Sequence, residues 1–255
     1  MIIKSAQNRM AKRYAELVEK RRSRKKFGML AVEGAQEIGY ALRGGYQLEY
    51  LLFPEGSMVD KTLLQQAKHF AEVDQRLFEK ITYRGLNSGI AAIMDAVEYR
   101  VDGRRWNKVL VLENIEKPGN LGALFRTALA SGCEAIITTG SSTDFYNPNC
   151  IRSSVGTVFL LPHWHMENEA ALAWLQAQQL PVCITDLTGS QSLYEGSLPE
   201  RVAFVFGAEH QGVSDFWRNH SQQRLRIPMQ GNIDSLNLSA SAAVVLYEHY
   251  RKFGS

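Results

Sequence analysis

The alternation of short apolar segments with helical segments after residue 105 constrains the fold more than any other feature of this chain. Apolar stretches recur at 109–113, 134–139, 182–185 and 202–206, with helical patterns between them. Short, continuous apolar strands separated by helices are typical of a parallel sheet covered on both faces. The sequence therefore predicts an α/β fold with a parallel sheet. The same patterns indicate strands at 158–161 and 225–227 and helices at 121–130, 167–178 and 236–252.

The first hundred residues show the pattern of a separate, smaller α/β unit. A helical pattern over 5–22 precedes an apolar strand at 27–34, and further helices and strands follow up to about residue 100. The polar, turn-rich run at 101–106 suits a linker. The sequence thus predicts two domains, at residues 1–102 and 103–255.

Positive charge is concentrated near the N-terminus. Ten Lys or Arg and two acidic residues occur between residues 4 and 26, although the whole chain has a net charge of only +3. A solvated helix face would also carry such charges, but the density favours contact with a polyanion such as nucleic acid. The residues expected to make this contact are Lys20, Arg21, Arg22, Arg24, Lys25 and Lys26.

Several classes of protein are excluded by what the sequence lacks. It has no apolar run of the roughly 18–20 residues that would span a bilayer and no signal-peptide core, which predicts a cytoplasmic location. Cys133, Cys150 and Cys183 are widely spaced and are expected to be buried, not paired or metal-bound. His163 and His165 have no further ligand at a useful spacing, so no metal site is expected. The glycine-rich nucleotide-binding motifs are absent.

Three loops that follow predicted strands carry unusual polar residues, at 113–128, 206–214 and 227–239. Ligands of open parallel sheets bind beyond the carboxyl ends of the strands, so these loops are the candidate site. In the first loop, Asn120 is well placed to cap the following helix, a structural role that competes with a functional one.

The second and third loops each have a structural alternative as well. Gly207 and Gly212 bracket Glu209, and glycines let backbone approach a ligand, although a plain turn would use them too. In the third loop, a helix cap explains Ser235 or Asn232 but not the full set of amides and hydroxyls, because such residues compete with helix hydrogen bonds. The excess polarity favours a ligand or a partner chain.

These loops carry a family resemblance. The segments PGNLGALFRTA (118–128), FGAEHQGVS (206–214) and IPMQGNIDSLNLS (227–239) resemble, in order and spacing, the three motifs of the SpoU (TrmH-like) RNA ribose 2′-O-methyltransferases of the SPOUT superfamily. Residues 1–100, with Ser5, Asn8 and Val32-Glu33-Gly34, resemble the substrate-binding domain that many members carry. The resemblance implies S-adenosylmethionine as cofactor, RNA as substrate, a C-terminal trefoil knot and a homodimer whose active site is completed across the interface.

The resemblance also assigns roles to individual residues. The implied catalytic set is Arg126, Asn120, Glu209, Ser235 and Asn237, and the implied cofactor contacts are Gly207, Ile227, Met229, Leu236 and Leu187. A guanidinium keeps its proton at ordinary pH, so we expect Arg126 to stabilise a developing alkoxide while the proton leaves through Ser235, phosphate or water. Deletion of residues 1–26 is expected to abolish RNA binding and leave a folded dimer.

Ribosomal RNA is the expected substrate because of the added N-terminal domain, and tRNA is the alternative. The run Tyr146-Asn-Pro-Asn149 departs from the D-P-x-x-P-K segment expected of close relatives, which bears on the choice of target nucleotide. A catalytically silent RNA-binding protein with the same fold is disfavoured because the implied catalytic residues are all present. A small-molecule methyltransferase or dehydrogenase is disfavoured by the missing glycine fingerprint and the basic first helix.

Overall fold

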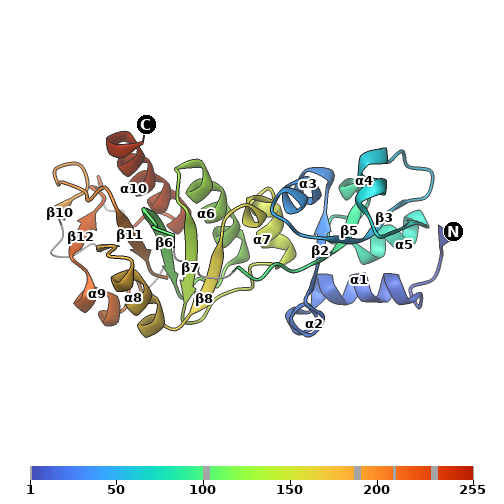
Figure 1. Cartoon of the computed structure of the whole chain (residues 1–255), viewed down its shortest axis with the longest axis horizontal. Helices are drawn as coiled ribbons and strands as arrows, with labels where there is room; N and C mark the ends of the chain where they lie inside the picture. The colour runs from blue at the N-terminus through green and yellow to red at the C-terminus, as the bar shows by residue number, and fades with distance from the viewer. Residues whose placement is uncertain (1, 100–103, 187–190, 209–210, 231–234, 255) are drawn as a thin grey trace. The chain divides into compact units, whose positions relative to one another are not determined.

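The computed structural model describes residues 2–99, 104–186, 191–208, 211–230 and 235–254, which form two compact units (Figure 1). The first unit contains Met1–Glu98 together with Asp144–Leu160, and the second contains Tyr99–Thr143 and Leu161–Ser255. The predicted division at residue 102 did not anticipate this return of the chain to the first unit.

The first unit is built on a five-stranded mixed sheet with the strand order β1-β4-β3-β5-β2. Strand β5 is antiparallel to its neighbours β2 and β3, whereas β4 is parallel to β1 and β3. Its strands are β1 (Ile2–Ile3), β2 (Met29–Glu33), β3 (Leu48–Pro54), β4 (His69–Val73) and β5 (Ala91–Asp95). Its helices are α1 (Arg9–Glu19), α2 (Arg21–Phe27), α3 (Ala35–Arg43), α4 (Lys61–Gln66), α5 (Gln75–Ile81), α7 (Pro148–Ser153) and the 3-10 helices η1 (Gly85–Ser88) and η2 (Thr157–Phe159).

The basic N-terminal segment is part of the core of this unit. The helix predicted over 5–22 is divided into α1 and α2, because Lys20 adopts an extended conformation between them. Ala11, Tyr14 and Leu17 of α1 are buried and pack into the same apolar cluster as side chains of the sheet. The expectation that residues 1–26 can be deleted without unfolding is therefore wrong, since the deletion would open this core.

Residues 144–160 join the first unit through polar and aromatic contacts. The Arg24 guanidinium forms a buried ion pair with Asp144 at 2.7 Å. The hydroxyls of Tyr46 and Tyr146 lie 3.0 Å apart, and the Tyr46 ring packs edge-on against Phe159. The strand predicted at 158–161 is wrong, because its apolar residues form the buried turn of η2 and not an edge of the second sheet.

The second unit contains a seven-stranded sheet with the order β10-β12-β9-β11-β6-β7-β8. All of its strand pairs are parallel, which confirms the predicted α/β fold. The strands are β6 (Lys108–Glu113), β7 (Ala135–Thr139), β8 (His163–Met166), β9 (Val182–Thr185), β10 (Gln191–Ser192), β11 (Val202–Phe206) and β12 (Gln223–Arg226).

Helices cover both faces of this sheet (Figure 1). Val109 and Val111 of β6 belong to a cluster with α8 (Asn168–Ala177) and α9 (Asp215–His220), while the alternate residues face the other side. On that side α6 (Pro118–Ala130) packs against α10 (Leu238–Phe253). The buried apolar stripe of α6 contains Leu121, Leu124, Phe125 and Ala128, at the spacing of one helix face.

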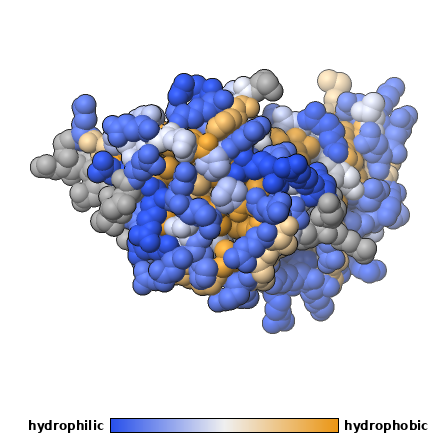
Figure 2. Space-filling model, turned by 60° about the vertical axis from the view of Figure 1, so that its left-hand side comes forward, coloured by the Kyte–Doolittle hydropathy of each residue, from blue (hydrophilic) through white to orange (hydrophobic). Residues whose placement is uncertain are grey.

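The cysteines are buried and unpaired, as predicted. The face in Figure 2 is mostly hydrophilic, with apolar side chains exposed between the polar ones. No helix within the described ranges is both long and apolar enough to cross a bilayer.

Candidate functional site

The carboxyl ends of the parallel strands of the second unit open into a cavity of about 570 Å³, a size typical of small-ligand sites. Its wall begins with Thr185 and Asp186 at the end of β9 and Phe206 at the end of β11. The segment after β12 contributes Ile227 and Met229. The start of α10 and the residues before it close the wall with Ser235, Leu236, Leu238 and Ser241.

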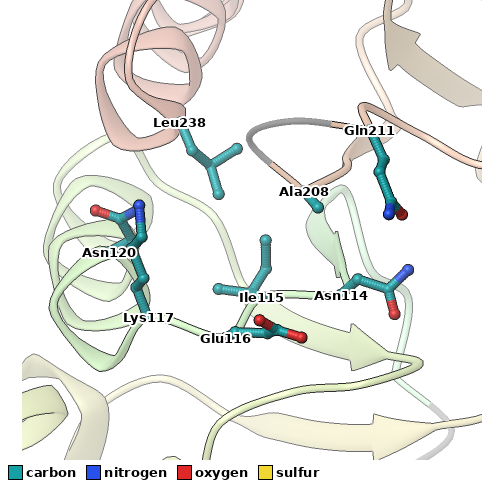
Figure 3. Close-up of a pocket in the computed structure, with 8 residues that line it drawn as sticks. All are labelled: Asn114, Ile115, Glu116, Lys117, Asn120, Ala208, Gln211 and Leu238. Atoms are coloured by element: carbon teal, nitrogen blue, oxygen red, sulfur yellow. The ribbon is translucent and has the colours of Figure 1, made fainter.

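A second cavity of about 330 Å³ shares part of its lining with the first. Figure 3 shows the eight residues that line it. Asn114, Ile115 and Glu116 follow β6, and Lys117 and Asn120 lie at the start of α6. Ala208, Gln211 and Leu238 line both cavities. Residues of all three polar loops found in the sequence therefore meet at this edge of the sheet.

Glycines are required where the loop after β11 turns back on itself. A Cβ on Gly207 would lie 1.9 Å from the carbonyl oxygen of Gly212, so no larger residue fits there. Gly212 donates its N–H to Ala208 at 2.9 Å and has a φ of +64°, a conformation that glycine adopts readily. The two glycines thus fold backbone tightly against the cavity.

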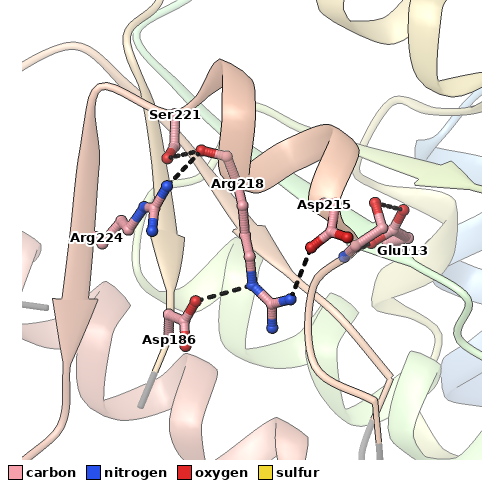
Figure 4. Close-up of polar contacts among 7 residues, drawn as sticks. Glu113, Asp186, Asp215, Arg218, Ser221 and Arg224 are labelled. Carbon is pink, nitrogen blue, oxygen red and sulfur yellow. Dashed lines mark hydrogen bonds and ion pairs between the residues drawn. The ribbon is translucent and has the colours of Figure 1, made fainter. Parts of the chain in front are cut away.

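A buried carboxylate anchors the end of this loop to β6 (Figure 4). Glu113, 1% exposed, accepts hydrogen bonds from the Ser214 N–H and hydroxyl, both at 2.7 Å. It also accepts one from the Asn168 amide at 3.1 Å, and Asn168 in turn accepts the Trp217 indole N–H at 3.0 Å. Glu113 therefore ties together the ends of β6, the glycine loop and the first turn of α8.

The charged groups of the larger cavity form a second network (Figure 4). Arg218 pairs with Asp186 at 3.0 Å and with Asp215 at 3.1 Å. Hydrogen bonding to Asp186 and then to Asp215 raises the pKa of Arg218 above its ordinary value. Asp186 and Arg218 line the larger cavity, whereas Asp215 is mostly exposed and does not line it, so the ion pair at the wall carries no net charge.

The structure places most of the implied cofactor contacts in one wall. Gly207, Ile227, Met229 and Leu236 all line the larger cavity, together with the implied catalytic residue Ser235. Leu187 and Glu209 lie outside the described residues.

Asn120 does not cap α6, although one interpretation of the sequence assigned it that role. The helix begins three residues earlier than predicted, with Pro118 in its first turn and Lys117 at the cap position. This places Asn120 inside the first turn, where it lines the smaller cavity.

Asn237 is the N-cap of α10, a role that the sequence suggested for Ser235 or Asn232. Its side chain accepts hydrogen bonds from the Ser239 N–H at 3.0 Å and from the Ser239 hydroxyl at 2.6 Å. Asn237 therefore has a structural function in addition to any part in chemistry.

Arg126 is exposed and lines neither cavity. It lies six residues after Asn120 on α6, which separates the two positions by about 9 Å along the helix and turns them to different sides. Within the described part of the chain, Arg126 therefore shares no cavity with Asn120 or Ser235.

The basic cluster of the first unit is exposed except at one position. Arg24 is 6% exposed, and its guanidinium contacts Asp144 and the carbonyl oxygens of Leu17 and Val18. It therefore holds the fold, unlike the exposed residues Lys20, Arg21, Arg22, Lys25 and Lys26.

Other polar residues of the site were not identified from the sequence. Asp186 directly follows a predicted strand, a position that could have marked it. Glu113 is the first residue of the first polar loop, but nothing in the sequence indicated its burial or its contacts, and Arg218 lies on the short helix α9, which was not predicted. Among the described residues, no group of three or more His, Cys, Asp or Glu is arranged to hold a metal ion.

Comparison with known proteins identifies the family to which the second unit is related. The model of the SpoU rRNA methylase family matches residues 107–247, which include all three motifs and both cavities. The chain belongs to the SpoU rRNA methylase family. The resemblance inferred from the motifs is thereby confirmed. A second family model, described as an MRM3-like substrate binding domain, matches residues 8–92.

Individual SpoU relatives match over nearly the whole chain. A crystal structure titled RNA 2′-O ribose methyltransferase is 35% identical, covers 99% of both chains and has a TM-score of 0.87. The 23S rRNA (guanosine(2553)-2′-O)-methyltransferase RlmP of Bacillus subtilis is 26% identical over 96% of this chain and 97% of the relative. An AdoMet-bound rRNA methyltransferase of Sinorhizobium meliloti, 24% identical with a TM-score of 0.90 over 100% and 99% of the two chains, has the same fold.

Proposed function

We propose that this SpoU protein transfers a methyl group from S-adenosylmethionine to a ribose 2′-hydroxyl of ribosomal RNA. The observation that carries the proposal is the pair of adjoining cavities, which share Ala208, Gln211 and Leu238 and can hold a donor beside an acceptor. The names of the relatives support the substrate class, because they describe ribose methylation of RNA, in several cases of 23S rRNA.

The larger cavity fits the proposed cofactor. It combines apolar contacts from Ile227, Met229 and Leu236 with close backbone at Gly207, as an adenosine group requires. The carboxylate of Asp186 on the cavity wall can interact favourably with the positive charge of a sulfonium. When bound, S-adenosylmethionine supplies an already activated methyl group, so the protein has mainly to position the reactants. Leu187 belongs to the proposed set because it follows the predicted strand 182–185 in the sequence, two residues beyond its end.

The smaller cavity is the proposed acceptor side. Asn120 and Lys117 can orient the ribose and its phosphate, while Ser235, on the wall of the larger cavity, lies on the proton's route from the 2′-hydroxyl. Glu209 and Asn237 keep their proposed roles in orienting the surrounding groups. Transfer needs no base of unusual strength, because the proton leaves as the oxygen–carbon bond forms.

We further propose that Arg126 acts in the active site of a partner subunit. Its exposed position on α6, away from both cavities of its own chain, is consistent with a homodimer in which each site uses the arginine of the other copy. There the guanidinium would stabilise the developing alkoxide. A trefoil knot formed by the segment leading into α10, and a cytoplasmic location with the ribosomal substrate, belong to the same proposal.

Variants of Arg126 test the function and the role together. Arg126→Ala should abolish methyl transfer to ribosomal RNA while S-adenosylmethionine still binds in calorimetry. Leu236→Trp should fill the cofactor cavity and abolish both. When the two inactive variants are co-expressed as mixed dimers, one complete site should form and activity should return. Loss of cofactor binding in Arg126→Ala, or mixed dimers that stay inactive, would contradict the assignment.

A further inference from the structure

A small cleft of about 10 Å³ on the first unit is bordered by an exposed aromatic ring and two arginines. It is lined by side chains from separate stretches of chain, among them Val18 of α1, Glu33 of β2, Tyr83 and Arg84 before η1, and Arg152 of α7. Tyr83 is 48% exposed, unusually open for a large aromatic side chain. The Arg152 guanidinium, also exposed, lies 5.8 Å from the centre of the Tyr83 ring.

The backbone that carries Tyr83 is held from below by a buried carboxylate. Glu33, 8% exposed, accepts hydrogen bonds from the backbone N–H of Tyr83 at 2.6 Å and of Arg84 at 2.9 Å. Its first oxygen also accepts the Tyr14 hydroxyl at 2.8 Å. Burial, followed by the charge of Glu33, raises the pKa of Tyr14 well above its ordinary value, so this donor keeps its proton. The exposed ring therefore projects from fixed backbone.

An exposed arginine borders the cleft beside Tyr83. Arg84 forms an ion pair with Glu37 at 3.1 Å, and the carboxylate of Glu33 accepts hydrogen bonds from three neutral donors. Arg152 contacts the amide oxygen of Asn149, a neutral group, and keeps its charge exposed. Val18 lies in the last turn of α1, directly before the basic helix α2. Arg152 and the exposed basic residues of α2 are thus the cations available to the phosphates of a strand whose base stacks on Tyr83.

We propose that Tyr83 and Arg152 form a stacking platform for an unpaired nucleobase of the RNA substrate. Proteins read single-stranded RNA by stacking bases on aromatic rings and guanidinium planes, with nearby cations on the phosphates. A preorganised ring avoids much of the entropy cost of ordering it on binding. The proposal rests on the proposed function in one respect, that the ligand of this unit is RNA. It gives Glu33 of the Val32-Glu33-Gly34 motif a positioning role beneath the platform.

Binding of a fluorescein-labelled, single-stranded uridine 12-mer, measured by anisotropy with the full-length protein, tests the platform. Tyr83→Leu should weaken binding by roughly 5- to 150-fold, as expected when one base loses its stacking partner. Tyr83→Phe should bind like the wild type because the ring remains. Phe70→Ala is the matched control, since Phe70 is a 58% exposed aromatic side chain elsewhere on the same unit and should have no effect.

Salt dependence separates stacking from phosphate contact. Tyr83→Leu should keep the wild-type slope of log affinity against log salt, whereas Lys25→Gln, at an exposed cation of α2, should reduce it by about one phosphate contact. A blunt 12-base-pair RNA duplex offers no unpaired base along its length, so Tyr83→Leu should not change its binding. Equal losses for duplex and single strand, equal losses for Tyr83→Phe and Tyr83→Leu, or no binding of the 12-mer by the wild type would overturn the platform.

Two further measurements keep this result distinct from the function itself. Cofactor calorimetry and methyl transfer to ribosomal RNA by the wild type test the proposed function without reference to Tyr83. If the wild type transfers methyl groups but Tyr83→Leu changes neither 12-mer affinity nor the KM for RNA, the platform fails alone. If Tyr83→Leu weakens 12-mer binding while the wild type methylates no RNA, the proposed function fails and the platform stands.

Discussion

At the scale of single residues, two buried carboxylates hold exposed loops in place. Glu113 anchors the glycine loop beside the cavities, and Glu33 anchors the backbone of Tyr83. In both cases the carboxylate ends a strand and accepts backbone N–H groups of a loop far away in the sequence. Hydrogen bonds to a charged acceptor are stronger than neutral ones, so one side chain can fix a whole turn.

Replacement of Glu113 tests this anchoring. Glu113→Ala leaves the Ser214 N–H and the Asn168 amide without their buried acceptor, so the free energy of unfolding should fall by about 2–4 kcal/mol. Cofactor affinity should fall as well, because the loop that lines the cavity loses its tether. Urea unfolding and calorimetry measure the two effects. Glu167→Gln, an exposed carboxylate beside the same helix α8, should change neither. Wild-type stability in Glu113→Ala would refute the anchoring role.

The cysteines give a prediction for alkaline pH. Burial raises the pKa of Cys183 to about 12, so in the folded protein this thiol keeps its proton well above the pH at which it ionises in the unfolded chain. Above about pH 9 the unfolded state therefore binds fewer protons than the folded state, so the free energy of unfolding decreases as the pH rises. Each buried thiol contributes at most about 1.4 kcal/mol per pH unit to this decrease. Urea unfolding at pH 8 and pH 10 should show a smaller loss in Cys183→Ala than in the wild type. Equal losses would contradict the assignment.

At the scale of elements, the basic helix α2 combines a structural and a binding role on neighbouring residues. Arg24 points inward to Asp144, with side-chain exposures of 5% and 15%, whereas Lys25 is exposed. The density of basic residues in the sequence could not distinguish the role of Arg24 from that of Lys25, because both belong to one cluster. The inward position of Arg24 depends on Asp144, which lies 120 residues away in the chain.

Substitution of the two neighbours should separate these roles. Arg24→Gln leaves Asp144 without its partner in a mostly buried site and should destabilise the first unit by about 3–5 kcal/mol. Lys25→Gln should leave stability unchanged and reduce the salt dependence of RNA binding by about one contact. Thermal unfolding and anisotropy titrations across salt concentrations measure the two effects. The division of roles fails if Lys25→Gln destabilises the protein or Arg24→Gln does not.

The sequence predicted those elements whose pattern is local. The parallel strands β6, β9 and β11 and the apolar stripe of α6 follow from periodicity and burial. The strand predicted at 158–161 failed because a short apolar run does not reveal which unit it packs into, and η2 is buried in the first one. Helix caps were misplaced by a few residues at Asn120 and Asn237, since several Asn and Ser residues near each helix start could serve.

The candidate site shows the same limit. The motifs predicted that three loops meet, and Asn120, Ala208 and Leu238 do line one cavity. The contacts of Glu113 and Arg218 arise from tertiary packing between β6, β9 and α9 and have no signature in the linear sequence. Arg126 lies in the first motif but lines neither cavity of its own chain. Only the folded structure shows that it is apart from them.

At the scale of the whole molecule, the chain is divided into two units with separate sheets and cores. Each has its own proposed contact with RNA, at the cavities of the second unit and at the cleft and basic helix of the first. Binding and methyl transfer should therefore respond to different substitutions. Substitution of Tyr83 or Lys25 should change RNA binding, whereas substitution of Arg126 should abolish methyl transfer.

The return of residues 144–160 to the first unit affects how such proteins can be recombined. A hybrid enzyme that borrows the recognition unit of a relative would need two transplanted pieces, equivalent to residues up to 98 and to 144–160, because Asp144 and Tyr146 complete contacts begun by Arg24 and Tyr46. A single junction near residue 100 would combine mismatched halves of one core. A sequence change in either piece must likewise be matched by a change in the other, so substitutions in the two stretches should be correlated among relatives.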